Sequence, residues 1–186
     1  MIYILYKGIK ALKRFFRIVF MKIFFKKNLH INKKSKILLL GKCHLDFETK
    51  RALWNIAGNF IVRDNLRIRV CNDGVLSFGN NVFINNDCSI TCRNRITIGN
   101  DCIIGENVKI YDHNHNYKTL EIPISKQGFS DGFVEIGNNV WIGSNVVILK
   151  DVIIGDNCVI GAGCVVYKNI PENSIMYSNG RVDAIK

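Results

Sequence analysis

Two histidines in one short polar run are the side chains of this 186-residue chain best suited to chemistry. The run, DHNHNY at residues 112–117, contains His113 and His115, which are two of the four histidines in the sequence. Imidazole titrates near neutral pH, so it can take a proton from a hydroxyl group and pass it on. The pair is therefore a candidate for general-base catalysis, with Asp112 or a backbone carbonyl as the group that orients His113.

A metal site is the competing interpretation of this pair. It would need a third histidine or a set of cysteines and carboxylates. His30 lies in a basic N-terminal tail and His44 precedes the regular part of the chain, so neither is an obvious third ligand. We therefore expect no bound metal.

The elements that must position the two histidines repeat every six residues. A helix has a period of 3.6 residues and a strand a period of two, so a period of six indicates a hexapeptide-repeat β-helix. Glycine usually follows the repeated residue, and a small or branched apolar residue comes four residues after it. The repeated positions are Phe78, Ile84 and Ile90, then Ile98, Ile104 and Ile110, then Ile136, Ile142, Ile148, Ile154, Ile160 and Val166.

This pattern predicts an all-β fold in which three hexapeptides close one triangular coil and the coils stack. The repeated residues point inward, and glycine and asparagine occupy corners whose bends need positive φ. Four of the seven cysteines fall in the small inward position, which favours core packing, and the odd count without a CxxC motif favours a reducing, cytoplasmic compartment. These four are Cys88, Cys102, Cys158 and Cys164.

The six-residue period is interrupted at two places. Ile90 and Ile98 are eight residues apart, and Ile110 and Ile136 are twenty-six residues apart. A solenoid tolerates an insertion only as an outward loop, and such loops usually line the binding face. We therefore expect a loop over residues 111–135 that begins with the two histidines.

The net charge of +11 belongs to one end of the chain. Residues 1–36 contain eleven Lys and Arg and no acid, whereas residues 37–186 contain fifteen charges of each sign. A neutral body does not support nucleic-acid binding. We expect a basic amphipathic segment at residues 1–36, a β-helix domain at residues 37–171 with irregular coils over 37–75, and a cap at residues 172–186.

Residues 1–27 are expected to form a basic amphipathic helix with an aromatic-rich apolar face. Its longest apolar run, Ile18–Met21, is too short to span a bilayer, and charges break the apolar region that a signal peptide needs. We favour a helix that lies in an anionic membrane surface over one docked on the prism or within a trimer. The cations expected on one side of the helix are Lys7, Lys10, Lys13, Arg14 and Arg17.

The repeats, the histidine run and the segment Asn139-Val140-Trp141-Ile142-Gly143-Ser144 resemble the left-handed β-helix acetyltransferases. The resemblance is to the galactoside and maltose acetyltransferases and to the capsule and O-antigen O-acetyltransferases, and it covers residues 76–171 best. It implies a left-handed parallel β-helix, a homotrimer, and acetyl-CoA as cosubstrate, bound between two subunits.

The resemblance also implies roles for residues on the acceptor side of the site. His113 matches the catalytic position, which takes the proton of the acceptor hydroxyl as it attacks the thioester directly, and His115 is the second choice. Asn85 matches a residue that hydrogen-bonds the acceptor sugar, and Trp141 matches an aromatic wall. The acidic residue that helps to hold a free sugar falls at Arg93 here.

On the coenzyme side, the backbone of Ser144 matches a donor that faces the thioester oxygen and stabilises the charge that develops there. Ala162, Lys168 and Arg181 match positions near the pantetheine and the nucleotide, where a cation suits the phosphates. The helical segment that caps the acceptor in the galactoside and maltose enzymes is replaced by the basic tail. Together with Arg93, this departure favours a saccharide attached to a lipid diphosphate.

The leading interpretation is an O-acetyltransferase that modifies a precursor of a surface polysaccharide, such as a capsule or O-antigen, at the inner face of the cytoplasmic membrane. The first alternative is an N-acetyltransferase of a nucleotide-linked amino sugar. A β-helix scaffold without turnover is disfavoured by His113 in a long loop, and a metal-dependent hydratase is disfavoured by the histidine count.

Overall fold

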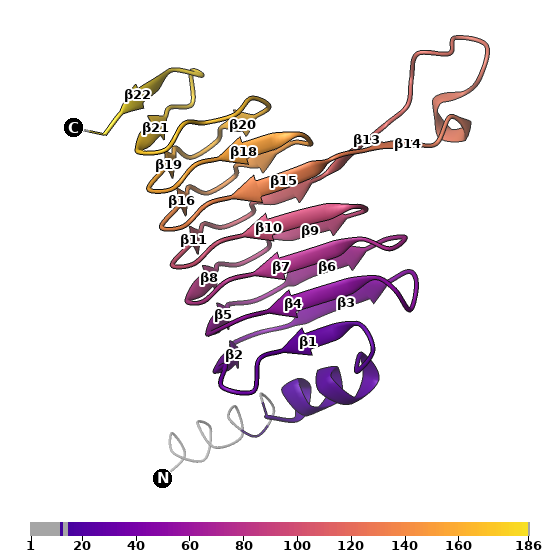
Figure 1. The fold of residues 1–186 in the computed structure, drawn as a ribbon, viewed down its shortest axis with the longest axis vertical. Helices are drawn as coiled ribbons and strands as arrows, with labels where there is room; N and C mark the ends of the chain where they lie inside the picture. The colour runs from indigo at the N-terminus through magenta and orange to yellow at the C-terminus, as the bar shows by residue number, and fades with distance from the viewer. Residues whose placement is uncertain (1–11, 13–14, 186) are drawn as a thin grey trace.

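The computed structural model describes residue 12 and residues 15–185, and the chain winds through them as a β-solenoid of about six turns (Figure 1). Three parallel sheets form the faces of a prism, and each turn contributes one strand to each face. Lys7, Lys10, Lys13 and Arg14 of the expected basic helix face lie outside the described residues.

The chain passes from the first sheet to the second, then to the third, and back to the first. The first sheet contains β1 (Leu29–Ile31), β4 (Leu53–Ile56), β7 (Val75–Phe78), β10 (Arg95–Ile98), β15 (Phe133–Ile136) and β18 (Val152–Ile154). The second contains β2 (Ile37–Leu39), β5 (Phe60–Val62), β8 (Val82–Ile84), β11 (Ile103–Ile104), β16 (Trp141–Ile142), β19 (Val159–Ile160), β21 (Ser174–Met176) and β22 (Val182–Ala184). The third contains β3 (Cys43–Phe47), β6 (Leu66–Val70), β9 (Ser89–Cys92), β12 (Lys109–Tyr111), β17 (Val147–Ile148) and β20 (Val165–Val166).

The inside of the prism is filled by the repeated isoleucines and the small residues four positions after them. All twelve repeated residues are buried, and identical positions stack in register, as where Ile104 pairs with Ile142 and Ile142 with Ile160. The four inward cysteines are buried and unpaired, which confirms their expected core packing. Their thiols also donate to backbone carbonyls, as Cys158 does to Pro171 at 2.9 Å.

The coils before residue 76 are regular, which corrects the expectation of irregular opening coils. Ile37 pairs with Phe60 and Arg67 with Ser89, in parallel register. These coils escaped the six-residue search because β3 and β6 are five residues long and their turns are longer than those of later coils. Regular pairing already begins at β1, inside the segment 1–36 that was expected as a tail.

Large aromatic side chains fill this wider part of the prism. Trp54, Phe60 and Phe78 are all buried, with ring centroids 5.0 to 5.7 Å apart. Later coils, by contrast, contain Cys, Val and Ile at the inward positions. The prism core therefore changes from aromatic to small side chains along the chain.

The corner glycines serve close approach between coils, which corrects the expectation that they supply positive φ. Positive φ falls instead on the Asn or Asp two residues later, as at Asn139 and Asn157. These side chains form ladders between coils, since Asn139 Nδ2 donates to Asn157 Oδ1 at 2.9 Å. A Cβ on Gly143 would lie 2.6 Å from the backbone N of Ala162 in the next coil, so no larger residue fits there.

Replacing Gly143 with asparagine is expected to destabilise the protein by about 1–3 kcal/mol because the new side chain overpacks two stacked backbones. Gly128→Asn is the matched control: Gly128 has φ +75 and open space around its Cβ. Asparagine tolerates that conformation, so the control should cost about 1 kcal/mol or less. Unfolding by urea measures both, and equal losses would show that backbone conformation, not coil contact, selects glycine.

A helix over residues 15–24 lies at the N-terminal end of the stack (Figure 1). Its Ile18 and Met21, with Phe25 just after it, pack on the first coil, where the Phe25 and Phe47 rings lie 5.2 Å apart. Within the described residues, no helix is both long enough and apolar enough to cross a membrane. At the other end of the stack, β22 turns back antiparallel to β21.

Candidate active site

The loop that carries the histidines leaves the prism at the corner between the third and first sheets, after β12. Its two ends pair as an antiparallel ribbon of β13 (His113–His115) and β14 (Phe129–Asp131), which projects from the stack (Figure 1). The tip contains a short 3-10 helix, η1 (Ile124–Lys126). Gln127 ties this tip together, since its side-chain amide donates to the carbonyls of Thr119 and Ile122, each at 2.7 Å.

A buried carboxylate anchors the ribbon at its base. Asp112 has no exposed surface, and its carboxylate accepts hydrogen bonds from the backbone N–H of Arg93 at 2.9 Å and of Asn94 at 2.8 Å. These two residues are the extra pair in the eight-residue spacing between Ile90 and Ile98. The first interruption of the repeat therefore supplies donors to the carboxylate that opens the second.

The same carboxylate orients His113. The Nδ1 atom of His113 lies 3.2 Å from Asp112 Oδ1, which resolves the choice between Asp112 and a backbone carbonyl. Burial by itself raises the pKa of Asp112, but hydrogen bonds with His113, with the N–H groups of Arg93 and Asn94 and with the Cys92 thiol outweigh it and hold the pKa below the ordinary value of 3.8. Asp112 therefore stays ionised and fixes one nitrogen of the imidazole.

Aromatic rings enclose the imidazole of His113 on two sides. Its ring centroid lies 6.2 Å from that of Tyr111 and 5.6 Å from that of Phe129, both edge to face. Only 14% of its side chain is exposed. Because Nδ1 faces Asp112, Nε2 is the ring nitrogen left to accept a proton from a bound molecule.

Arg93 and His115 gather around the same Phe129 ring. The guanidinium of Arg93 lies 4.0 Å from the ring centroid, and its Nε donates to Asp131 Oδ1 at 2.8 Å. The His115 ring centroid lies 4.4 Å from that of Phe129. The sequence-based site did not include Phe129 or Asp131, because no periodicity marks the returning half of the ribbon.

The residues expected on the opposite side of the site lie elsewhere on this chain. Asn85, Ser144 and Ala162 occupy the corner between the second and third sheets, and Trp141 points outward from the second sheet with 56% of its surface exposed. The strands of the third sheet separate this corner from His113. One chain therefore brings together His113, His115 and Arg93, but not these four.

The corner at Ser144 has a backbone donor with no acceptor among the described residues. In the coil below, Glu106 N–H donates to the Ser144 hydroxyl at 3.2 Å. The equivalent position above Ser144 is Ala162, whose methyl group cannot accept a hydrogen bond. The N–H of Ser144 is thus available at the surface.

The two remaining cations lie near the C-terminal end of the stack. Lys168 follows β20, with its Nζ 5.5 Å from the centroid of the Tyr167 ring. Arg181 lies in the turn between β21 and β22, where it pairs with Asp183 at 3.1 Å and stacks on Tyr177. Neither residue is near His113 in the strand order of the stack.

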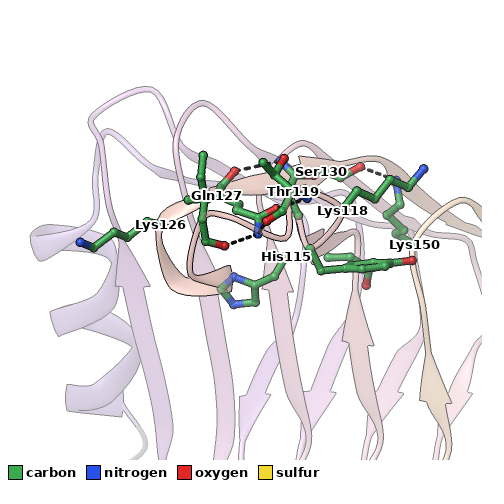
Figure 2. Close-up of a pocket in the computed structure, with 11 residues that line it drawn as sticks. His115, Lys118, Thr119, Lys126, Gln127, Ser130 and Lys150 are labelled. Carbon is green, nitrogen blue, oxygen red and sulfur yellow. Dashed lines mark hydrogen bonds between the residues drawn. The ribbon is translucent and has the colours of Figure 1, made fainter.

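A hollow of about 610 Å³ lies under the loop, next to the histidines (Figure 2). His115 lines it, together with Lys118, Lys126 and Lys150. Lys118 and Lys150 reach toward the same end of the hollow, whereas Lys126 points away from it (Figure 2). Lys150 is held there by Ser130 at 2.9 Å and is paired with Asp151, which lies outside the lining.

Cations and neutral polar groups make this hollow suited to a polar, negatively charged molecule, because no carboxylate lines it. In the described part of the chain, no group of three or more His, Cys, Asp or Glu side chains is placed to hold a metal ion. The chemistry available at this corner is therefore proton transfer by an oriented imidazole beside a cationic hollow.

Comparison with known proteins agrees with this architecture. The family model described as bacterial transferase hexapeptide (six repeats) matches residues 133–168. No functionally curated protein matches the sequence.

Three solved structures show what the chain resembles. A galactoside acetyltransferase in complex with coenzyme A is 27% identical with a TM-score of 0.55, and the match covers 86% of this chain and 64% of that one. A maltose O-acetyltransferase from Clostridium difficile 630 is 25% identical with a TM-score of 0.57, and the match covers 88% and 73%. AntD, an N-acyltransferase from Bacillus cereus in complex with dTDP and coenzyme A, is 16% identical with a TM-score of 0.65 over 84% and 82%, a likeness of fold alone.

Proposed function

We propose that this hexapeptide-repeat β-helix protein, which resembles galactoside and maltose acetyltransferases, transfers an acetyl group from acetyl-CoA to a sugar hydroxyl. The observation that carries the proposal is the buried Asp112 carboxylate bonded to His113 Nδ1 at the base of the loop. This pair leaves Nε2 to act as a general base of fixed orientation. The resemblance to enzymes that use coenzyme A supports the choice of donor.

The reaction is a direct attack without an acyl-enzyme. His113 Nε2 takes the proton of the acceptor hydroxyl while its oxygen bonds to the thioester carbonyl carbon. The C–S bond then breaks, the proton passes to the leaving coenzyme A sulfur, and the acetyl ester of the sugar remains. Asp112 stabilises the imidazolium that forms in between, and the N–H of Ser144 is the donor that we assign to the thioester oxygen.

The proposal includes a homotrimer of left-handed prisms, because His113 and Ser144 lie at different corners of one chain. A neighbouring copy that brought its Ser144 corner against the His113 ribbon would complete the site. Trp141, exposed on the adjacent face, would then wall the acceptor, with Asn85 bonding it and Ala162, Lys168 and Arg181 along the coenzyme.

The acceptor that we propose carries phosphate, as in a precursor of a surface polysaccharide attached to a lipid diphosphate. The cationic hollow beside His115 supports this choice because Lys118 and Lys150 converge at one end of it. Arg93 is engaged with Asp131 and Phe129, so we assign it the role of shaping the acceptor side rather than acting as a free cation. Rapid turnover of soluble galactosides would contradict this acceptor class.

An amino sugar linked to a nucleotide is the second candidate acceptor, and it would make the protein an N-acetyltransferase. The observation that favours it is the structural likeness to AntD. A nucleotide diphosphate would suit the same cationic hollow. The two acceptors differ in the bond formed, an ester or an amide.

Transfer of labelled acetyl from acetyl-CoA tests the proposed function. The acceptors are membrane-borne glycolipid in one arm and nucleotide-linked amino sugars in the other, and each product is treated with mild alkali. We expect label in the glycolipid that alkali releases, since esters hydrolyse where amides do not. Label that resists alkali would favour the amino sugar, and no transfer to either acceptor with no binding of coenzyme A would overturn the enzyme assignment.

A further inference from the structure

The helix over residues 15–24 has two apolar sides, and only one of them is covered by this chain. Ile18, Met21 and Phe25 pack on the first coil. The other side is exposed and aromatic, and the Phe20 and Phe24 rings stack on each other at 4.4 Å. Its large side chains, with their exposed fractions, are Phe15 at 62%, Phe16 at 60%, Phe20 at 54%, Ile23 at 69% and Phe24 at 70%.

A helix that is apolar all round is normally buried in a larger apolar environment. Positions 16, 20, 23 and 24 follow the spacing of a single helix side, so their apolar surface is continuous rather than scattered. Continuous exposed patches of this kind mark sites of interaction with proteins or membranes. Something outside this chain therefore covers the helix.

The charges around the helix select the partner. Lys22, Lys26 and Lys27 are exposed beside the aromatic side chains, and residues 1–36 contain eleven cations without one acid. A second copy of the same segment would repel it, and the body of the protein is neutral, so neither offers a complementary charge. The headgroups of an anionic bilayer do, and the aromatic side chains then enter the acyl boundary.

A groove at the junction of the helix and the first coil adds to this surface. It has a volume of about 400 Å³, and Phe16, Phe20, Met21 and Cys43 line it with apolar atoms. Arg17, Lys42 and His44 complete the lining. Arg17 is fixed by donating to the carbonyl of Gly41 at 2.6 Å. An apolar groove edged by cations is suited to a lipid with a negatively charged headgroup.

We propose that the exposed side of the helix over residues 15–24 docks on the surface of an anionic lipid bilayer and holds the N-terminal end of the solenoid against it. The helix lies at one end of the stack, so the coils rise from the surface with the loop away from it (Figure 1). The helix binds parallel to the surface and does not cross it. This docking does not depend on the proposed acetyl transfer.

Co-sedimentation of the full chain with lipid vesicles tests the proposal. The vesicles contain phosphatidylcholine alone or with phosphatidylglycerol added, and the variant is the triple change Phe16→Ser, Phe20→Ser and Phe24→Ser. We expect binding to the anionic vesicles only, weakened by salt, and at least tenfold weaker for the triple variant. The matched control, Leu120→Ser with Tyr167→Ser, removes apolar groups that are equally exposed but lie outside the helix, and it should bind as the unchanged protein does.

Three outcomes would overturn the docking proposal. The first is absence of binding to either vesicle, and the second is equal binding by the triple variant. The third is a fall in oligomeric mass of the triple variant by light scattering without a change in vesicle binding, which would place the helix between copies of this chain. Coenzyme A binding, measured in parallel, separates loss of docking from failure of the proposed function.

Discussion

Replacing His113 with alanine is expected to lower acetyl transfer by about 10²–10⁴-fold, the usual contribution of a positioned general base. The fold should persist, because the imidazole meets its aromatic neighbours edge to face at the surface rather than filling the prism core. Transfer of labelled acetyl under saturating acetyl-CoA measures the effect. Coenzyme A binding by calorimetry should be unchanged, since His113 is assigned to the acceptor.

The matched control is His115→Ala, which removes the neighbouring imidazole from the hollow without touching Asp112. It should weaken acceptor binding and leave the maximal rate within about tenfold of the unchanged protein, as expected for a group that is not the general base. A reversal of the two effects would identify His115 as the base.

Mixing two inactive variants tests whether two copies share one site. If His113 of one copy faces Asn85 of the next, His113→Ala and Asn85→Ala chains unfolded and refolded together should regain activity at about a quarter of their sites, by random assembly of a closed ring. Refolding of each variant alone should regain none. Absence of any recovery in the mixture would mean that each site lies within one copy.

Asp112→Asn is expected to reduce stability and transfer together. The carboxylate serves two backbone N–H groups and one imidazole in a fully buried position, and an amide can satisfy only part of this set. Leaving buried donors unsatisfied costs about 1–3 kcal/mol each, so we expect a loss of about 2–4 kcal/mol in the free energy of unfolding. Transfer should fall because the imidazole loses the group that fixes it.

The pH dependence of this loss follows from the lowered pKa of Asp112. Because the folded protein holds that pKa below the ordinary value of 3.8, the ionised carboxylate contributes stability above the unfolded pKa. The contribution is lost as the pH falls through the folded pKa. The difference in unfolding free energy between the unchanged protein and Asp112→Asn should therefore be constant near neutral pH and shrink below about pH 4.

Urea unfolding at a series of pH values measures this difference. Asp131→Asn is the matched control, since Asp131 also faces a cation at the ribbon but is one-third exposed. Its effect should stay below about 1 kcal/mol, as is usual for exposed ion pairs. A loss for Asp112→Asn that did not shrink in acid would mean that packing, not charge, accounts for it.

The sequence identifies the repeated part of this fold because each inward residue recurs at a fixed distance along the chain. It does not identify the wider coils around Trp54 and Phe60, where bulky side chains replace the regular isoleucines and the turns lengthen. The histidines could be found because a loop interrupts a regular period. The role of Asp112 could not, because it depends on N–H groups of Arg93 and Asn94, nineteen and eighteen residues earlier, that only coil stacking brings together.

The strand order also predicts how far above a bilayer the protein works. The helix packs beside β3, and β6, β9 and β12 follow it in the third sheet. At about 4.8 Å per strand, His113 stands roughly 14 Å above the coil on which the helix lies. With that helix at the headgroups, the reactive hydroxyl belongs to a sugar held well clear of the lipid. The number of coils between helix and loop then sets this height, and inserting one coil would raise it by a single strand spacing without altering the site.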